Sequence, residues 1–184
     1  MKRFWRKINK GIILLFILVV VAAVWSSVDT VRYNSRWESA EAEATAFAAN
    51  LAEVCKWPKD MPKITSADLE RKNDKYMPYL DAGLAKVKPH LFSSKALDKE
   101  IKEFAMRYIS SFFIDEIKPE QVTFTPQFSK IRVQKDTASA KGVISSKTTT
   151  STGKIINRSF ECEIRMEYVN DKWTVVEFLQ LQDF

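Results

Sequence analysis

The amino-acid sequence predicts an α+β domain behind one N-terminal transmembrane helix, with helices packed on a curved, roughly four-stranded antiparallel sheet. Three observations lead to this fold class. Residues 11–28 carry no charge, apolar residues recur at helical spacing between 29 and 114, and from Glu120 onward β-branched and aromatic residues dominate. Helices followed by consecutive strands are typical of the α+β class. The length of 184 residues suffices for one such domain with its own core.

The N-terminal residues have the composition of a membrane anchor. Residues 1–10 carry five basic and no acidic side chains, and residues 11–28 are an uncharged apolar run. As a helix this run is about 27 Å long, close to the ~30 Å hydrocarbon core of a bilayer. Because basic flanks favour the cytoplasmic side, we expect a cytoplasmic stub at 1–10, a single-pass helix in the cell membrane at 11–28, and an extracytoplasmic domain at 29–184. The alternative is a cleaved signal peptide, which the long run and the bulky Trp25 disfavour.

The charge distribution argues against a nucleic-acid-binding protein. The formal net charge is +6, but five of the 29 basic residues lie in the first ten positions. The remaining 24 basic and 23 acidic residues leave the body at about +1. We therefore expect no direct contact with nucleic acid.

Residues 29–56 are expected to form the first helix of the domain, with a stripe of apolar residues. The stripe is either a face for a partner or a second copy, or a face buried against the chain's own domain. The second interpretation is favoured, because the stripe is only about three heptads long and lacks a coiled-coil charge pattern. Its members are Trp37, Ala40, Ala44, Phe47, Leu51 and Val54, of which Trp37, Ala44, Phe47 and Leu51 are the candidate contact residues for a partner or an oligomer.

Further helices and strands are expected after a break at residues 56–58, where Pro58 ends the first helix. A short helix begins at Thr65 or Ser66, another follows Pro78, and a stronger amphipathic helix covers residues 95–114. The four strands are expected at 120–135, 137–150, 155–168 and 172–184.

The clearest strand, residues 155–168, indicates what kind of sheet this is. Apolar side chains at even positions from Phe160 to Tyr168 alternate with charged ones at odd positions from Glu161 to Glu167. A long strand with one apolar and one polar side is typical of an antiparallel sheet that has one face in water.

No catalytic or metal-binding motif is present, and we expect a protein without enzymatic activity, cofactor or metal. The chain has one histidine, His90, so a multi-histidine site is impossible, and His90 is expected to be a structural or a surface residue. Cys55 and Cys162 either form a disulfide or, as is favoured, are two ordinary buried thiols.

Three carboxylates near the expected core are the remaining candidates for chemistry. Asp115 and Glu116 end the strong helix, and Glu177 lies among apolar strand residues. A carboxylate inside a helix-lined sheet is desolvated and can act as a base. The favoured interpretation is that each is a helix-end or solvent-facing charge. The lysines of residues 84–102 are expected to form a solvated face, with anionic lipid or peptidoglycan as an alternative contact.

These features together resemble a known family. The basic stub, the single anchor, the helices and the late sheet ending in DKWTVVEF resemble membrane-anchored, cone-shaped domains of the nuclear-transport-factor-two-like superfamily. Within it, AEATAFAANLAEVCKWPKD and ADLERKNDKYMPYLDAGL, at 42–60 and 67–84, resemble the TcpC-type conjugation proteins. Those are similar in layout to the bitopic assembly factor of type IV secretion systems. Larger TcpC-type proteins have a second similar domain, which is not seen in this sequence.

The resemblance implies a scaffold that contacts other membrane subunits of a conjugative DNA-transfer channel, with homo-oligomerisation as an option. Two other classes stay open. A hollow cone would bind a small apolar ligand or catalyse proton transfer, and the same fold also fits a cell-envelope stress or sporulation factor.

Overall fold

The computed structural model describes residues 10–58, 60–62, 74–112 and 117–182. The chain divides into two compact units, Met1–Glu38 and Ser39–Phe184. Helix α1, Lys10–Val54, begins in the first unit and ends in the second. The expected membrane segment and the expected first helix of the domain are therefore one continuous helix, which ends at Val54 rather than at residue 56.

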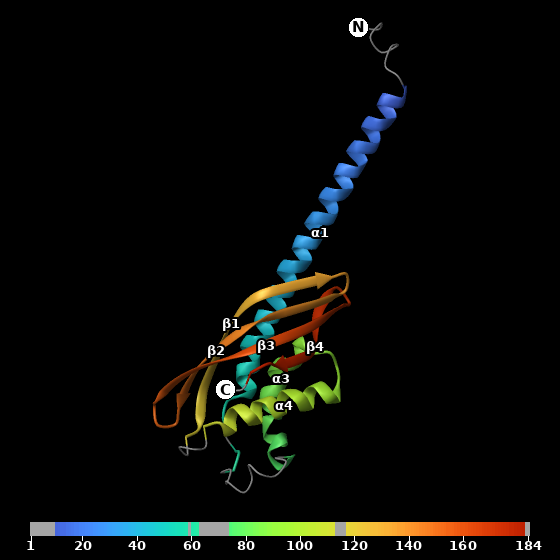
Figure 1. Ribbon diagram of the computed structural model, residues 1–184. Helices are drawn as coiled ribbons and strands as arrows, with labels where there is room; N and C mark the ends of the chain where they lie inside the picture. Colours follow the sequence, from blue (N-terminus) through green and yellow to red (C-terminus); the bar gives the residue numbers. More distant parts are fainter. Residues whose placement is uncertain (1–9, 59, 63–73, 113–116, 183–184) are drawn as a thin grey trace. The chain divides into compact units, whose positions relative to one another are not determined.

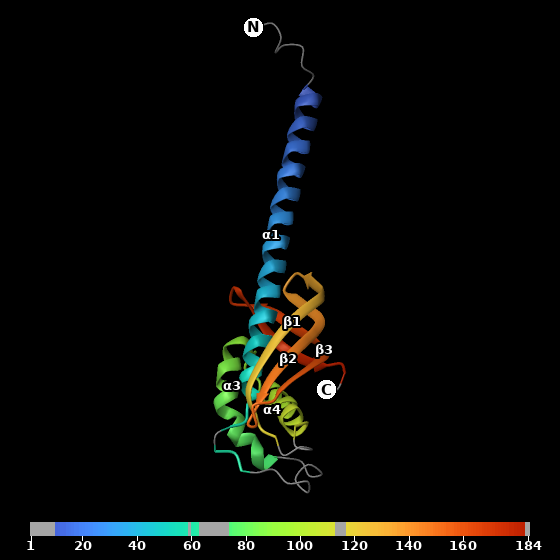
Figure 2. The ribbon, with the colours of Figure 1, turned by 90° about the vertical axis from the view of Figure 1, so that its left-hand side faces the viewer.

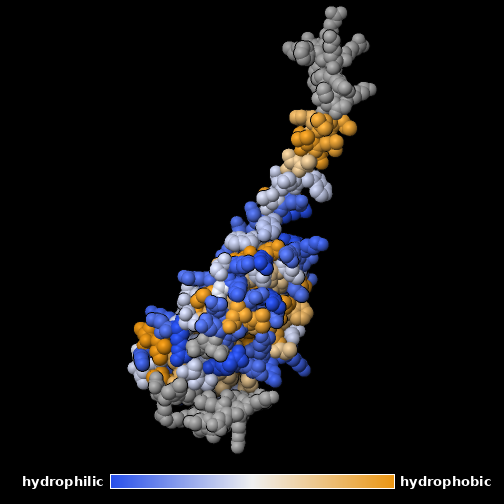
Figure 3. Space-filling model, in the orientation of Figure 1, coloured by the Kyte–Doolittle hydropathy of each residue, from blue (hydrophilic) through white to orange (hydrophobic). Residues whose placement is uncertain are grey.

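The described surface of the first unit is apolar over the residues expected to lie in the membrane. Large hydrophobic side chains between Leu14 and Val28 are exposed, and Figure 3 shows them as a hydrophobic stretch of the helix. By length and composition this helix can cross a membrane, and it fits a single-pass anchor. Of the expected cytoplasmic stub, residues 1–9 lie outside the described residues.

The helices of the second unit are short apart from α1 and α4. The 3-10 helix η2, Asp74–Leu80, runs into α3, Asp81–Val87, and then into η3, Lys88–His90. Helix α4, Lys95–Ser110, begins where the Ser94 hydroxyl accepts a hydrogen bond from the Leu97 N–H. It ends before the expected residue 114. The helix expected at Thr65 or Ser66 lies outside the described residues.

The four strands are antiparallel and follow one another in space as they do in sequence, in the order β1-β2-β3-β4. Their bounds are Pro119–Gln134, Thr137–Thr150, Ile155–Val169 and Lys172–Gln180. The sheet is twisted and curved, with the helices on one face (Figures 1 and 2). Lys135, Asn170 and Asp171 take positive φ values in the hairpin turns, and so does Gly153. The predicted α+β fold class is confirmed.

Aromatic rings fill the space between the helices and the sheet. Phe104 of α4 is 1% exposed. Its ring centroid lies 6.5 Å from that of Phe124 on β1, 5.4 Å from Phe160 on β3 and 5.0 Å from Phe178 on β4. The contacts with Phe124 and Phe178 are edge to face, a geometry that adds to the free energy gained by burial. The rings thus join α4 to three of the four strands.

The first helical residues of the second unit contact its last strand. The ring of Phe47 on α1 lies 5.7 Å from that of Phe178, edge to face. The indole Nε1 of Trp173 donates a hydrogen bond to Ser39 Oγ at 3.0 Å, across 134 residues of sequence. The domain is therefore closed by contacts between its two ends.

A β-bulge in β1 depends on a glycine in β2. The register between the two strands shifts between Phe128 and Lys130, and Gly142 lies opposite Phe128. A Cβ atom on Gly142 would lie 2.2 Å from the carbonyl oxygen of Gln127 and 2.6 Å from Phe128 Cα. Only glycine allows the two backbones to approach this closely.

Candidate functional site

The apolar stripe of α1 is the first candidate surface. Ala44, Phe47 and Leu51 are fully buried within the second unit. The interpretation as a face buried in the chain's own domain is therefore confirmed for these three residues, and they are not accessible to a partner while the domain is folded. Trp37 belongs to the first unit and stays a proposed contact. A buried face and a partner seam have the same helical spacing, so the sequence pattern alone does not separate them.

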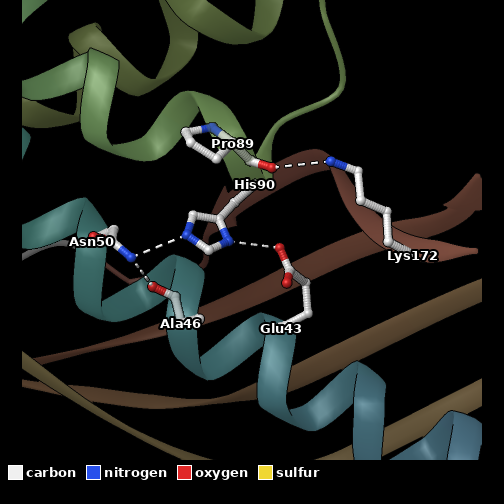
Figure 4. Close-up of polar contacts among 6 residues, drawn as sticks. All are labelled: Glu43, Ala46, Asn50, Pro89, His90 and Lys172. Carbon is white, nitrogen blue, oxygen red and sulfur yellow. Dashed lines mark hydrogen bonds and ion pairs between the residues drawn. The ribbon is translucent and has the colours of Figure 1, made fainter.

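His90 is the centre of a polar cluster between η3 and α1 (Figure 4). Its Nδ1 lies 2.7 Å from Glu43 Oε1, and its Nε2 lies 3.0 Å from Asn50 Nδ2. Asn50 Nδ2 also donates to the Ala46 carbonyl at 2.9 Å. Because a carboxylate only accepts, Nδ1 carries the proton and donates to Glu43, while Nε2 accepts from Asn50. Both ring nitrogens have protein partners, which agrees with the expected structural role.

Through this cluster, His90 joins α1 to η3 by polar contacts. Replacing the His90 side chain should therefore destabilise the domain by a predictable amount. We expect His90→Ala to lower the free energy of unfolding by about 1–3 kcal/mol, because the largely buried Glu43 carboxylate and the Asn50 amide lose their partner. Chemical denaturation of the full-length protein in detergent measures this loss. Lys172→Ala, which removes only an exposed 3.5 Å contact to the Pro89 carbonyl, is the control and should change stability by less than about 0.5 kcal/mol. Equal effects of the two changes would contradict the structural role of His90.

The two cysteines are separate buried thiols in the structure, as favoured from the sequence. Both side chains are fully buried, and neither forms a disulfide. Burial raises the pKa of Cys162 to about 12 and raises that of Cys55 well above its ordinary value. Neither thiol is therefore a nucleophile near neutral pH, since the reactive species is the thiolate.

Thiol labelling tests this burial directly. We expect a maleimide at neutral pH to leave Cys55 and Cys162 unmodified in the folded protein and to label both after denaturation without reductant. The folded state keeps protons that the unfolded thiols release above about pH 8.5, so the free energy of unfolding should fall as the pH rises beyond that value. Asn157→Cys, which adds a thiol at an exposed position of β3, is the positive control. Labelling that requires a reductant would instead indicate a disulfide.

The carboxylate candidates give no buried base among the described residues. Glu177 Oε2 accepts from Arg165 Nη1 at 2.7 Å on the water-exposed side of the sheet, and Glu163 Oε1 accepts from Arg165 Nε at 3.0 Å. The expectation of a solvent-facing charge is thus confirmed for Glu177. Asp115 and Glu116 lie outside the described residues. Within the described ranges, no group of three or more His, Cys, Asp or Glu side chains is placed to hold a metal ion.

The outer face of the sheet, opposite the helices, is polar and exposed. Most of its basic residues lie on β1 and β2, and its acidic residues lie on β3 and β4 around Arg165. A shallow groove of about 320 Å³ crosses this face and is lined by side chains that include Arg132, Arg165 and Glu167. The basic set is Lys130, Arg132, Lys141 and Lys147, and the acidic set is Glu161, Glu163, Glu167 and Glu177.

These observations define a class of protein before any comparison. An α+β domain follows an apolar helix, its interior is filled by aromatic rings, and its described polar groups are paired or face water. The class is that of an α+β domain joined to one helix that is long and apolar enough to cross a membrane.

Comparison with known proteins gives structural likeness without sequence similarity. No protein-family model and no curated protein matches the chain. Among solved structures, CagV, described as a VirB8 homolog of the type IV secretion system of Helicobacter pylori, has a TM-score of 0.47 at 9% identity, over 78% of this chain and 98% of CagV. An Ntf2-like protein involved in plasmid conjugation has a TM-score of 0.39 at 9% identity, over 78% of this chain and 50% of that one. The intermembrane-space region of the chloroplast protein ARC6 has a TM-score of 0.37 at 12% identity, over 66% of this chain and 100% of that one.

Proposed function

We propose that this protein is a non-catalytic, single-pass membrane subunit that acts as a scaffold in a conjugative DNA-transfer channel of the type IV secretion class. One observation carries the proposal. Helix α1 is apolar and exposed from Leu14 to Val28, and from Ala40 to Val54 it contributes buried side chains to the core of the second unit. One helix thus supplies both an anchor and part of the domain. Conjugation is proposed as the process because residues 42–60 and 67–84 resemble TcpC-type conjugation proteins.

The proposed orientation follows from the charges at the N-terminus. Five basic residues precede the apolar run, which favours a cytoplasmic N-terminus and an extracytoplasmic domain. The partners would be other membrane subunits of the machine. They would meet the polar outer face of the sheet, or Trp37 on the first unit. The hollow-cone alternative has no support in the described core, because Phe104 and its neighbouring rings occupy the space between α4 and the sheet.

In-cell photo-crosslinking tests the partner class. A benzoyl-phenylalanine at Lys141, on the outer face of β2, or at Trp37 would be activated in the native membrane, and the captured proteins identified by mass spectrometry. Benzoyl-phenylalanine in place of Phe92, which is exposed and follows η3, controls for non-specific capture. Recovery of a transfer ATPase, a wall hydrolase or other bitopic transfer subunits supports the proposal. Recovery of envelope-stress proteins, or of this chain alone, overturns it.

A topology reporter tests the orientation separately. Alkaline phosphatase fused after Phe184 should be active, because the enzyme folds only outside the cytoplasm, and deletion of residues 11–28 should abolish this activity. An inactive full-length fusion that is present in the membrane would place the domain in the cytoplasm and contradict the proposed orientation.

A further inference from the structure

Three basic side chains on the outer face of the sheet have no acidic partner within the described part of the chain. Lys130, Arg132 and Lys141 are exposed on β1 and β2, and none of them forms an ion pair with another described residue. Elsewhere in the domain, ion pairs with carboxylates are formed by cations that include Lys56, Lys88 and Lys102. We call Lys130, Arg132 and Lys141 the basic patch.

Two members of the basic patch lie directly opposite each other. Lys130 on β1 pairs with Lys141 on β2, next to the β-bulge that begins at Phe128. Like charges at opposite positions of neighbouring strands destabilise a sheet. Glu163 is paired with Lys141 on the β3 side, but its Oε1 accepts a hydrogen bond from Arg165 Nε at 3.0 Å. The repulsion between the two lysines is therefore not balanced by an ion pair among the described residues, and a carboxylate from outside the chain would relieve it.

We propose that the basic patch binds an acidic segment of a partner protein through two carboxylates. One carboxylate would lie between the ammonium groups of Lys130 and Lys141, and the other would pair with the guanidinium of Arg132. Lys130 and Arg132 are two residues apart on one strand, so their side chains leave the sheet about 7 Å apart, and acidic residues at alternate positions of an extended segment have the same spacing. Arg132 also lines the groove of about 320 Å³, where neighbouring residues of such a segment would lie.

The rest of the outer face favours a protein segment over other anions. Glu161, Glu163, Glu167 and Glu177 lie on β3 and β4, beside the basic patch. A nucleic-acid strand or an anionic membrane carries negative charge along its whole surface, so these carboxylates would repel it. A protein segment can instead place acidic residues at the basic patch and neutral or basic residues opposite β3 and β4.

A second copy of this chain is a less suitable occupant. The carboxylates that it would offer from its own outer face include Glu163 and Glu177, and both of these already accept hydrogen bonds from Arg165. The inference deepens the proposed function and rests on it, because that function places a partner on the outer face of the sheet. It adds the chemistry of the segment by which that partner binds.

Photo-crosslinking from Val143 tests the proposal with the full-length chain in its native membrane. Val143 is 36% exposed and follows Lys141 by two residues on the same face, so a benzoyl-phenylalanine there leaves the basic patch intact. We expect mass spectrometry to find the cross-link in a partner segment with two or more Asp or Glu residues at alternate positions. Lys130→Gln combined with Lys141→Gln should reduce this adduct by about fivefold or more. Lys86→Gln combined with Lys95→Gln removes the same charge from exposed positions on the helices and should leave the adduct unchanged.

Denaturant titration of the same variants shows that they fold and tests the repulsion between the two lysines. Because each change removes one of two like charges, neither Lys130→Gln nor Lys141→Gln should lower the midpoint of unfolding. The second change should bring no further gain once the first has been made, since the repulsion is then already absent. A lowered midpoint in either single variant would show that these lysines stabilise the domain, and would overturn the proposal.

The other outcomes separate this inference from the proposed function. Equal capture with and without the two glutamine changes, or a cross-linked segment without acidic residues, would overturn the inference. An adduct with lipid, nucleic acid or a second copy of this chain would also overturn it, as would no adduct from a protein present in the membrane. The identity of the captured protein tests the proposed function instead. An acidic segment of an envelope-stress protein would support the inference and overturn the role in conjugation, and a transfer subunit cross-linked through a neutral segment would do the reverse.

Discussion

Replacing Phe104 by alanine is expected to lower the free energy of unfolding by about 3–5 kcal/mol, one of the two largest effects of a single substitution in this domain. The ring is 1% exposed and lies within 6.5 Å, centroid to centroid, of three other phenylalanine rings. Its removal leaves a cavity that Phe124, Phe160 and Phe178 cannot fill, because each is held on a different strand. A loss of this size is a large part of the stability of an ordinary domain.

Denaturant titration of the full-length protein in detergent, followed by near-ultraviolet circular dichroism, measures the effect. Phe92→Ala is the matched control. The Phe92 side chain is 46% exposed, so the same truncation there should cost less than about 1 kcal/mol. If Phe104→Ala unfolds at the same denaturant concentration as Phe92→Ala, the aromatic interior is not packed as described.

Gly142→Ala is expected to destabilise the domain for the opposite reason, because it adds an atom where there is no room. The added methyl group would lie 2.2 Å from one backbone atom of β1 and 2.6 Å from another, and backbone in the middle of a paired strand cannot move aside as a side chain does. We expect a loss of about 1–3 kcal/mol or more from this overpacking, with a changed register between β1 and β2 near Phe128. Hydrogen exchange of the backbone amides of β1 would report the local change.

Gly153 provides the control for Gly142. It lies in the turn between β2 and β3 with φ at 78°, and a Cβ atom built there would meet no atom within 4 Å. Gly153→Asn keeps a residue that tolerates positive φ and should cost only a few tenths of a kcal/mol. A protein in which Gly142→Ala is as stable as Gly153→Asn would show that β1 does not pass this close to β2.

The sheet was predictable from the sequence because its determinants are local. Alternation of apolar and charged residues from Phe160 to Tyr168, turn residues at Gly153 and Asn170, and β-branched residues in between place strand bounds within a few positions. The fold class followed from the order of helices and strands. The 3-10 helices η2 and η3 were not predicted, because segments of three to seven residues contain too few periods to leave a pattern.

The candidate surfaces were predictable only in part, because they depend on which segments meet. The stripe on α1 could not be assigned to core or partner until Phe47 was seen against Phe178. The cluster at His90 joins side chains 40 and 47 residues apart, and no spacing rule links them. The contact of residues 91–92 with β4 likewise depends on the path of the chain, which sequence alone does not give.

The contacts that close the domain also set the order of events during its synthesis. Phe47 and Ser39 lie on the first helix of the domain, and their partners Phe178 and Trp173 lie on its last strand. While the ribosome is still making β1 to β3, the apolar stripe of α1 is already complete but has no strand β4 to pack on. Folding dominated by such distant pairs is slow and leaves apolar surface exposed in the nascent chain. Strand β4 therefore completes the fold, and a chain truncated before Trp173 should remain dependent on chaperones, however well its anchor inserts.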